Sequence, residues 1–238
     1  MSNSTLVWIF FLNLSFISVI SGTYSYNYST FKTEAVQQDT LPENQILYNG
    51  KLWKNLYFMT EGDQFLFSKE FISGSVTIKG KTFSNILIKY DLYNDEILTP
   101  ADPGGIVQLN KERVDSFSLF YEGKTYHFIK NTEDCESEFN GYVNLLSKGD
   151  ISLFLKYVKK INAAKTEGQR DRFYLTHRLY IVKDSSPSRI RSNKNLLDAS
   201  DEYKTQIKDY IRRNKIRVSE DSPDSIIPVI SYWNIISQ

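Results

Sequence analysis

The sequence predicts an α+β fold, with a mainly antiparallel, curved β-sheet (half-barrel or sandwich-like) followed by a C-terminal helical pair. Three observations favour it. Aromatic residues make up 14% of the 238-residue chain, and aromatics are enriched in strands. Apolar and polar residues alternate along much of 46–192, between short turns. From residue 193 onward the apolar spacing lengthens to about 3.6 residues, the period of a helix.

The charge balance argues against two classes of protein. Lys and Arg number 29 against 28 for Asp and Glu, so the formal net charge is +1. A strongly basic nucleic-acid binder and a strongly acidic tail protein are both disfavoured, and we expect no nucleic-acid partner. Hydrophobic residues at 41% and charged residues at 24% are ordinary for a globular protein.

The N-terminus carries an export signature. The first charged residue is Lys32, and 6–20 is apolar apart from three polar residues. This run is short for a membrane span, which needs about 20 residues, but it matches the apolar part of a secretory signal with small residues near 21–23. No Lys or Arg precedes the run, so an uncleaved anchor and an ordinary buried helix stay open as alternatives. We predict a signal peptide at 1–22, no transmembrane span after its cleavage, and a periplasmic or outer-envelope location.

Residues 23–45 are rich in Ser, Thr, Tyr and Gln and lack periodicity. They predict an extended N-terminal arm, with an edge strand as the alternative because Tyr24, Tyr26 and Tyr28 alternate.

An antiparallel β domain is predicted at 46–192. Asn49-Gly50, Lys79-Gly80 and Glu122-Gly123 separate apolar stretches, as in hairpins whose turns need positive φ. Turns this short cannot make parallel crossovers. The predicted strands span 46–48, 51–53, 64–67, 75–78, 81–83, 85–93, 97–99, 106–109, 116–121, 124–129, 141–147, 151–159 and 173–183.

The strand at 85–93 shows the pattern most clearly. Ile86, Ile88, Tyr90 and Leu92 take one face, so only one side of the sheet is expected to meet the core. The stretches 163–172 and 184–192 are expected to be a loop and a turn or linker.

A C-terminal helical segment packed on the sheet is predicted at 193–238. Apolar residues from Leu196 to Ile216 form one helical face. A second helix follows Ser222-Pro223, and Pro228 favours a start near Ile227 because proline fits only the first turn.

A spaced series of residues between 46 and 130 resembles a class of uncharacterised, exported, β-rich envelope proteins of Gram-negative bacteria. The series is Gly74-Ser75-Val76, Gly80, Phe83, Tyr90-Asp91, Asp95-Glu96, Gly105-Ile106, Leu109-Asn110-Lys111-Glu112, Val114 and Phe117, with a fainter match at Ile230, Tyr232, Trp233 and Asn234. The resemblance implies no assigned activity. By analogy, a curved sheet with helices on one side resembles periplasmic lipoprotein carriers.

Catalytic and cofactor patterns are weak. His127 and His177 each lie on a predicted strand, and no nucleophile-elbow pattern accompanies them. Asp91, Asn94, Asp95 and Glu96 could ligate Ca²⁺, but turn chemistry accounts for them without a metal. We expect no catalytic residues, no metal site and no cofactor.

The aromatic residues of the sheet are the better functional candidates. We predict Tyr90, Tyr93, Tyr121 and Tyr126 as ligand-binding residues, with burial in the core as the alternative. The predicted function is an exported, non-catalytic envelope protein that binds a partner protein or a lipid or glycan ligand. A pocket lined by these rings would favour the ligand, and an exposed apolar edge the partner protein. The alternative is a hydrolase whose site is assembled from distant residues, with a histidine near both an acid and a Ser hydroxyl.

Overall fold

In the computed structural model, the chain divides into two units, Met1–Asp39 and Thr40–Gln238. The structure describes residues 47, 50–101, 103–131 and 139–238, all within the second unit. The predicted signal peptide and arm therefore lie outside the described residues.

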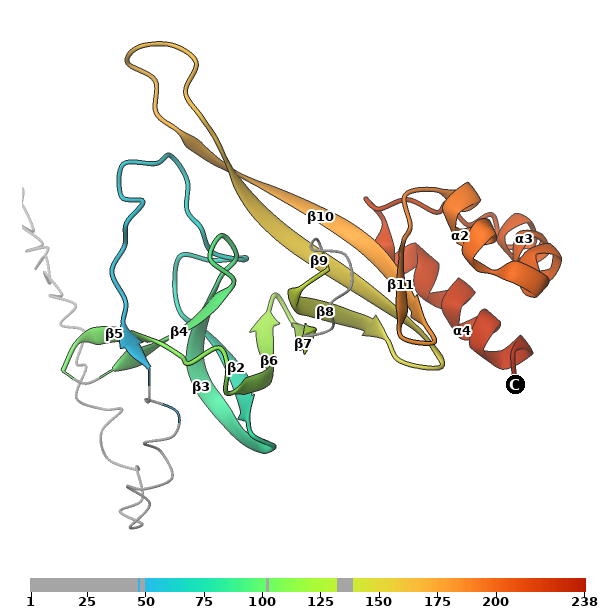
Figure 1. The fold of residues 1–238 in the computed structure, drawn as a ribbon, viewed down its shortest axis with the longest axis horizontal. Coiled ribbons are helices and arrows are strands. Elements are labelled where there is room, and N and C mark those ends of the chain that lie inside the picture. The colour runs from blue at the N-terminus through green and yellow to red at the C-terminus, as the bar shows by residue number, and fades with distance from the viewer. Residues whose placement is uncertain (1–46, 48–49, 102, 132–138) are drawn as a thin grey trace, which may run out of the picture. The chain divides into compact units, whose positions relative to one another are not determined.

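The second unit is built on one open antiparallel sheet of 11 described strands (Figure 1). This confirms the predicted α+β class with a mainly antiparallel sheet. The spatial order is β1-β5-β4-β3-β2-β6-β7-β8-β9-β10-β11. The strands are β1 (Lys51–Leu52), β2 (Ile72–Ile78), β3 (Lys81–Asp91), β4 (Glu96–Ala101), β5 (Gly105–Gln108), β6 (Val114–Tyr121), β7 (Lys124–Asn131), β8 (Gly141–Ser147), β9 (Ile151–Asn162), β10 (Arg172–Lys183) and β11 (Ser186–Arg189).

The sheet consists of two meanders that share a seam. Strands β2 to β5 run outward in chain order on one side, and β6 to β11 run outward on the other. The seam forms because β6 returns to pair with β2, with Val76 opposite Phe117. This pairing joins strands that no short turn connects, so turn signals alone could not predict it.

Two predicted hairpin turns are confirmed by their backbone. Lys79 and Gly80 join β2 to β3, and Glu122 and Gly123 join β6 to β7. All four residues have positive φ, between 48° and 78°. Two-residue turns with this geometry match the right-handed twist of the strands, and glycine is the residue that adopts it with least strain.

Two local predictions are wrong. Residues 64–67 are not a strand but an irregular segment that crosses the end of β3, with a single bridge between Phe65 and Asp91. The predicted hairpin of 46–48 with 51–53 lies partly outside the described residues, and the described strand β1 pairs with β5. The expected turn or linker at 184–192 contains β11, which pairs with β10 as an edge strand. Pro187 is tolerated there because one side of an edge strand has no ladder to break.

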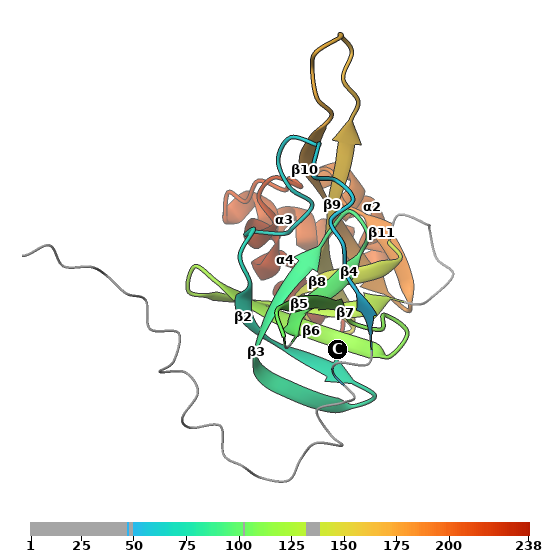
Figure 2. The same cartoon turned by 90° about the vertical axis from the view of Figure 1, so that its left-hand side faces the viewer.

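The C-terminal helices lie beside the β9–β11 end of the sheet (Figures 1 and 2). The first predicted helix is divided into α2 (Asn193–Ala199) and α3 (Lys204–Arg213) by a 3₁₀ turn at Asp201–Tyr203. The second is α4 (Ile227–Ile236), preceded by a 3₁₀ turn at Pro223–Ile226, which confirms the predicted start. None of the described helices has the length and apolar content that crossing a membrane requires.

The buried residues form two main cores. The ring core lies between β2, β3, β4, β6, β7 and β8 and includes Tyr90, Phe117, Phe128 and Tyr142. The helix-covered core lies between β9, β10 and the helices and is aliphatic except for Trp233. Tyr157 on β9 packs against both cores.

Candidate functional site

The structure separates the four tyrosines predicted to bind a ligand. Tyr90 is only 1% exposed in the ring core, where its hydroxyl donates to Asp95 Oδ1 at 2.5 Å. Burial raises the pKa of the Tyr90 phenol well above its ordinary value, and the neighbouring Asp95 carboxylate raises it further. Tyr90 therefore lies in the core rather than on a surface. Tyr93 lies on a surface beside the loop between β1 and β2. Tyr121 and Tyr126 lie together on another surface, next to Phe67.

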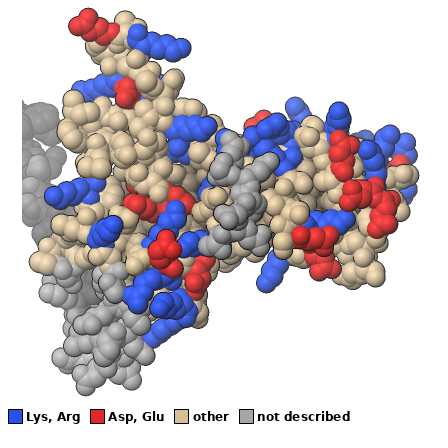
Figure 3. Space-filling view, viewed as in Figure 1, with Lys and Arg blue, Asp and Glu red and all other residues tan. Residues whose placement is uncertain are grey.

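Tyr93, in the turn after β3, belongs to an apolar surface formed mainly by the loop between β1 and β2. We define the apolar loop patch as Leu56, Phe58, Met59 and Tyr93, which are 75%, 75%, 61% and 38% exposed. Figure 3 shows side chains of both charges over the helices, and the four residues of the patch are themselves uncharged. Large apolar side chains gathered in water in this way mark interaction surfaces.

Three rings form the base of the patch. Tyr57 packs edge-on against Tyr93 at 4.9 Å and against Phe173 at 5.7 Å, and Tyr93 meets Phe173 at 5.5 Å. Edge-to-face pairs at these centroid distances are favourable for aromatic rings. Tyr57 thus ties the loop to the turn after β3 and to β10.

The loop backbone is held at both ends. Trp53 N–H donates to Ile106 O at 2.8 Å before the patch, and Glu61 exchanges bonds of 2.7 and 2.9 Å with Asp171 O and Phe173 N–H after it. Lys159 adds an ion pair to Asp63 at 2.9 Å. The exposed side chains therefore stand on a fixed backbone.

A second aromatic surface surrounds Phe67. We define the Phe67 cluster as Phe67, Tyr121, Tyr126 and Tyr157. Phe67 stacks on Tyr121 at 5.0 Å and 4°, and it meets Tyr126 at 4.4 Å and Tyr157 at 6.0 Å. All four rings are partly exposed.

The backbone at Phe67 is strained. Its φ is +64°, and Ser68 N–H donates to Leu66 O at 2.8 Å, which makes a three-residue turn of the rare, positive-φ kind. A bulky residue in this region is an outlier, and such strain costs on the order of 1–3 kcal/mol. The turn is fixed because buried Leu66 donates its own N–H to Tyr90 O at 2.9 Å. It directs the Phe67 ring onto the tyrosines.

The acidic turn after β3 is structural. The Asp91 carboxylate accepts bonds from the N–H groups of Tyr93 and Asn94 and from the side-chain amides of Asn94 and Gln64. Asp95 accepts from Tyr90 and from Lys111 Nζ at 2.6 Å. These donors occupy the oxygens that Ca²⁺ would need. Within the described residues no group of three or more His, Cys, Asp or Glu could hold a metal ion.

Neither histidine has the partners of a hydrolytic site. His127 Nδ1 lies 2.8 Å from Ser118 Oγ, and among the described residues it has no ion pair with a carboxylate. His177 Nε2 lies 2.7 Å from Glu220 O and 3.8 Å from Asp221 Oδ1, and no described Ser hydroxyl completes the set. A triad needs all three groups in contact, so this geometry gives the hydrolase alternative no support.

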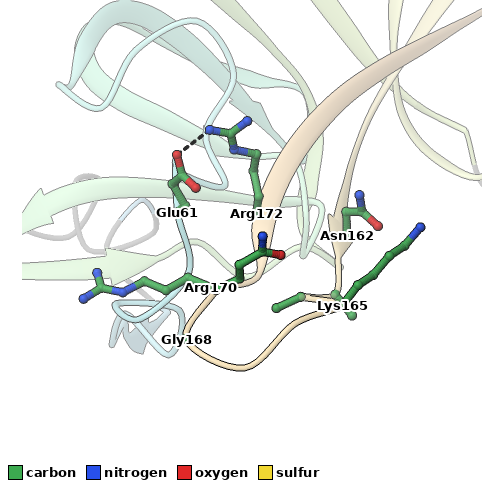
Figure 4. Close-up of a pocket in the computed structure, with 9 residues that line it drawn as sticks. Glu61, Asn162, Lys165, Gly168, Arg170 and Arg172 are labelled. Atoms are coloured by element: carbon green, nitrogen blue, oxygen red, sulfur yellow. Dashed lines mark hydrogen bonds and ion pairs between the residues drawn. The ribbon is translucent and has the colours of Figure 1, made fainter.

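The tip of the β9–β10 hairpin borders an open, polar hollow of about 730 Å³ (Figure 4). Arg172 is held by Glu61 on its wall. Figure 4 shows Lys165 and Arg170 pointing away from each other, on two sides of the loop. These cations do not converge on one point, as a bound anion would require.

Sequence reasoning missed Leu56, Phe58 and Met59 because no strand or helix period includes them. The available signal was three large apolar residues within four positions, between Asn55 and Thr60. The described unit is thus an open antiparallel sheet, covered by helices at one end, that carries two aromatic surfaces. Comparisons with protein-family models, curated proteins and solved structures find no match to this chain.

Proposed function

We propose that the chain is an exported, non-catalytic envelope protein that binds a partner protein through the apolar loop patch. The apolar, uncharged leader at 1–22 supports export, and the resemblance to exported envelope proteins supports a periplasmic or outer-envelope location.

The exposure of Leu56, Phe58 and Met59 carries the proposal. Burying a side chain of this kind contributes roughly 1.5–3 kcal/mol, so a protein that covers all three gains substantial binding free energy. Because the loop is pinned at both ends, little backbone entropy is lost on binding.

The composition of the patch suits a protein more than a lipid or a glycan. Aromatic residues, Met and Leu form its centre, and the ion pair of Glu61 with Arg172 lies at its margin. An apolar centre inside a polar rim is the arrangement of a protein–protein interface. Lipids and small ligands bind in pockets, whereas the patch is formed by an exposed loop.

Site-specific photocrosslinking in cells tests the proposal. Replacing Phe58 with p-benzoylphenylalanine puts a crosslinker in the centre of the patch. The same replacement of Ile235, 70% exposed on α4, is the matched control. We expect one discrete protein adduct from position 58 and none from position 235.

Serine substitutions make the test specific to the patch. Leu56→Ser with Met59→Ser should reduce the position-58 adduct at least fivefold, because the apolar area that the partner covers is lost. Equal adducts from positions 58 and 235, or adducts with lipid alone, would contradict the proposal.

Export is tested separately by intact-mass measurement of the protein from cells that make it naturally. We expect the mature chain to begin between residues 21 and 23. A chain that retains residues 1–22 and stays in the cytoplasmic fraction would overturn this part of the proposal.

A further inference from the structure

The Phe67 cluster is a second surface that the partner-binding role leaves unused. Tyr121 and Tyr126 lie near the tip of the β6–β7 hairpin, two positions apart in register and on the same face, because Leu119 pairs with Tyr126 and Tyr121 with Lys124. Phe67 comes from the strained turn before β2, and Tyr157 comes from β9. Four rings from three distant segments therefore meet at one partly exposed place.

Polar groups surround these rings. Lys124 Nζ lies 5.4 Å from the centre of the Tyr126 ring and pairs with Asp224 at 3.2 Å. The Lys124 and Asp224 side chains are at least half exposed. Glu122, the next residue along the chain, raises the pKa of the Tyr121 phenol through a hydrogen bond with its carboxylate. Charged groups thus lie beside both tyrosine rings.

We propose that the Phe67 cluster binds a carbohydrate. A pyranose ring has an apolar face of C–H groups, which suits an aromatic ring, and an edge of hydroxyls that can both donate and accept hydrogen bonds. The Tyr121 and Tyr126 rings supply the apolar contact. Lys124, Glu122 and Asp224 supply a donor and two acceptors at the edge.

The polar surroundings favour a sugar over an acyl chain. An acyl chain binds best in an apolar cavity that excludes water. On this surface it would make no hydrogen bond with Lys124 or Asp224, and covering these half-exposed charges would cost free energy. The strained backbone at Phe67 fits a binding role, since such outliers cluster at ligand sites and the strain aims this ring at the two tyrosines.

Calorimetry with soluble oligosaccharides tests the proposal. The probes are linear hexose and N-acetylhexosamine oligosaccharides of three to six units, with palmitate as the lipid arm. We expect saturable binding of at least one oligosaccharide, and we expect Tyr121→Ser and Tyr126→Ser each to weaken its Kd at least tenfold.

A residue on the same strand provides the control. Phe120 is 54% exposed and points to the opposite face of β6 from Tyr121. Phe120→Ser should leave the Kd within about twofold. A loss of binding equal to that of Tyr121→Ser would overturn the assignment.

Phe67→Gly keeps the test decisive if a tyrosine variant fails to fold. Glycine adopts positive φ without strain, so this variant should fold while it loses the ring, and its Kd should weaken at least threefold. Three results would overturn the proposal: no binding of any oligosaccharide, binding that Phe67→Gly leaves unchanged, or binding of palmitate alone. None of them affects the photocrosslinking result at position 58.

Discussion

The two cores of the sheet are enclosed in different ways. In the ring core, Phe117 stacks on Phe128 at 4.6 Å and meets Tyr90 and Tyr142 edge-on, both at 5.0 Å. In the helix-covered core, aliphatic side chains of β9 and β10 meet those of the helices around Trp233. In the ring core these four rings pack among aliphatic side chains that come mostly from the strands, whereas the buried side chains of the helix-covered core come from both the strands and the helices.

The covering layer depends on polar docking as well as on apolar contact. Asn234 on α4 donates through Nδ2 to Ile151 O and accepts from Ile151 N–H through Oδ1, both at 2.8 Å. This pair of bonds resembles one rung of a sheet ladder and fixes α4 along β9. The comparison teaches that the ring core depends on individual large side chains and the helix-covered core on its docking contacts.

The largest expected effect comes from removing one ring of the ring core. Phe117→Ala should lower the free energy of unfolding by about 3–5 kcal/mol. The substitution leaves a cavity between the rings of Tyr90, Phe128 and Tyr142, and these rings cannot move in to fill it completely. Urea unfolding measures the change. Phe120→Ala, on the exposed face of the same strand, should change it by less than about 0.5 kcal/mol. Equal losses from both variants would contradict the description of the ring core.

A smaller and more local effect is expected at the helix-covered core. Asn234→Ala should lower the free energy of unfolding by about 1–3 kcal/mol, because it leaves the Ile151 N–H and C=O groups without their partner. Hydrogen exchange should show the loss of protection mainly in α4 and β9. Ile235→Ala, at an exposed neighbour, should leave protection unchanged. A uniform loss over the ring core would show that the two cores do not differ in this way.

The smallest effect is a pH dependence where the cores meet. Burial is the main cause that raises the pKa of the Tyr157 phenol from 10.0 to about 12. Between these values the unfolded chain has lost a proton that the folded chain keeps, so stability present below pH 10 is lost as pH rises towards 12. Tyr157→Phe should lose less stability than the natural chain over this window. Urea unfolding at pH about 9, 10 and 11 measures the difference, and parallel pH curves would contradict it.

The sequence predicted two of the three hairpins that glycine signals, and the third, at Asn49-Gly50, lies partly outside the described residues. Gly80 and Gly123 identified their turns because positive φ strongly favours glycine there. The strand β11 escaped prediction inside the expected turn or linker at 184–192, because Asp184 and Ser185 adopt the hairpin-turn geometry without glycine, at φ values of 50° and 59°. The strand predicted at 64–67 is absent because this segment crosses the end of β3, where Leu66 N–H donates to Tyr90 O and Leu92 N–H donates to Gln64 O, instead of pairing along a strand.

The candidate surfaces were predicted only in part. Tyr121 and Tyr126 lie together because they flank one short turn. Tyr90 and Tyr93 separate because Tyr90 lies on the face of β3 that the alternation assigns to the core, whereas Tyr93 lies in the turn after the strand. Phe67 joined the cluster through a strained turn that no local preference favours.

The sequence by itself determined the antiparallel class, two hairpin turns and the change from strands to helices near residue 193, because these depend on local backbone preferences and short-range periodicity. The tertiary structure decided the β2–β6 seam, the burial of Tyr90 and the exposure of the loop at Leu56, Phe58 and Met59. These features depend on which distant segments pack together. The free energy of that packing comes from contacts between residues far apart in the sequence, and a local sequence pattern does not show which residues will meet.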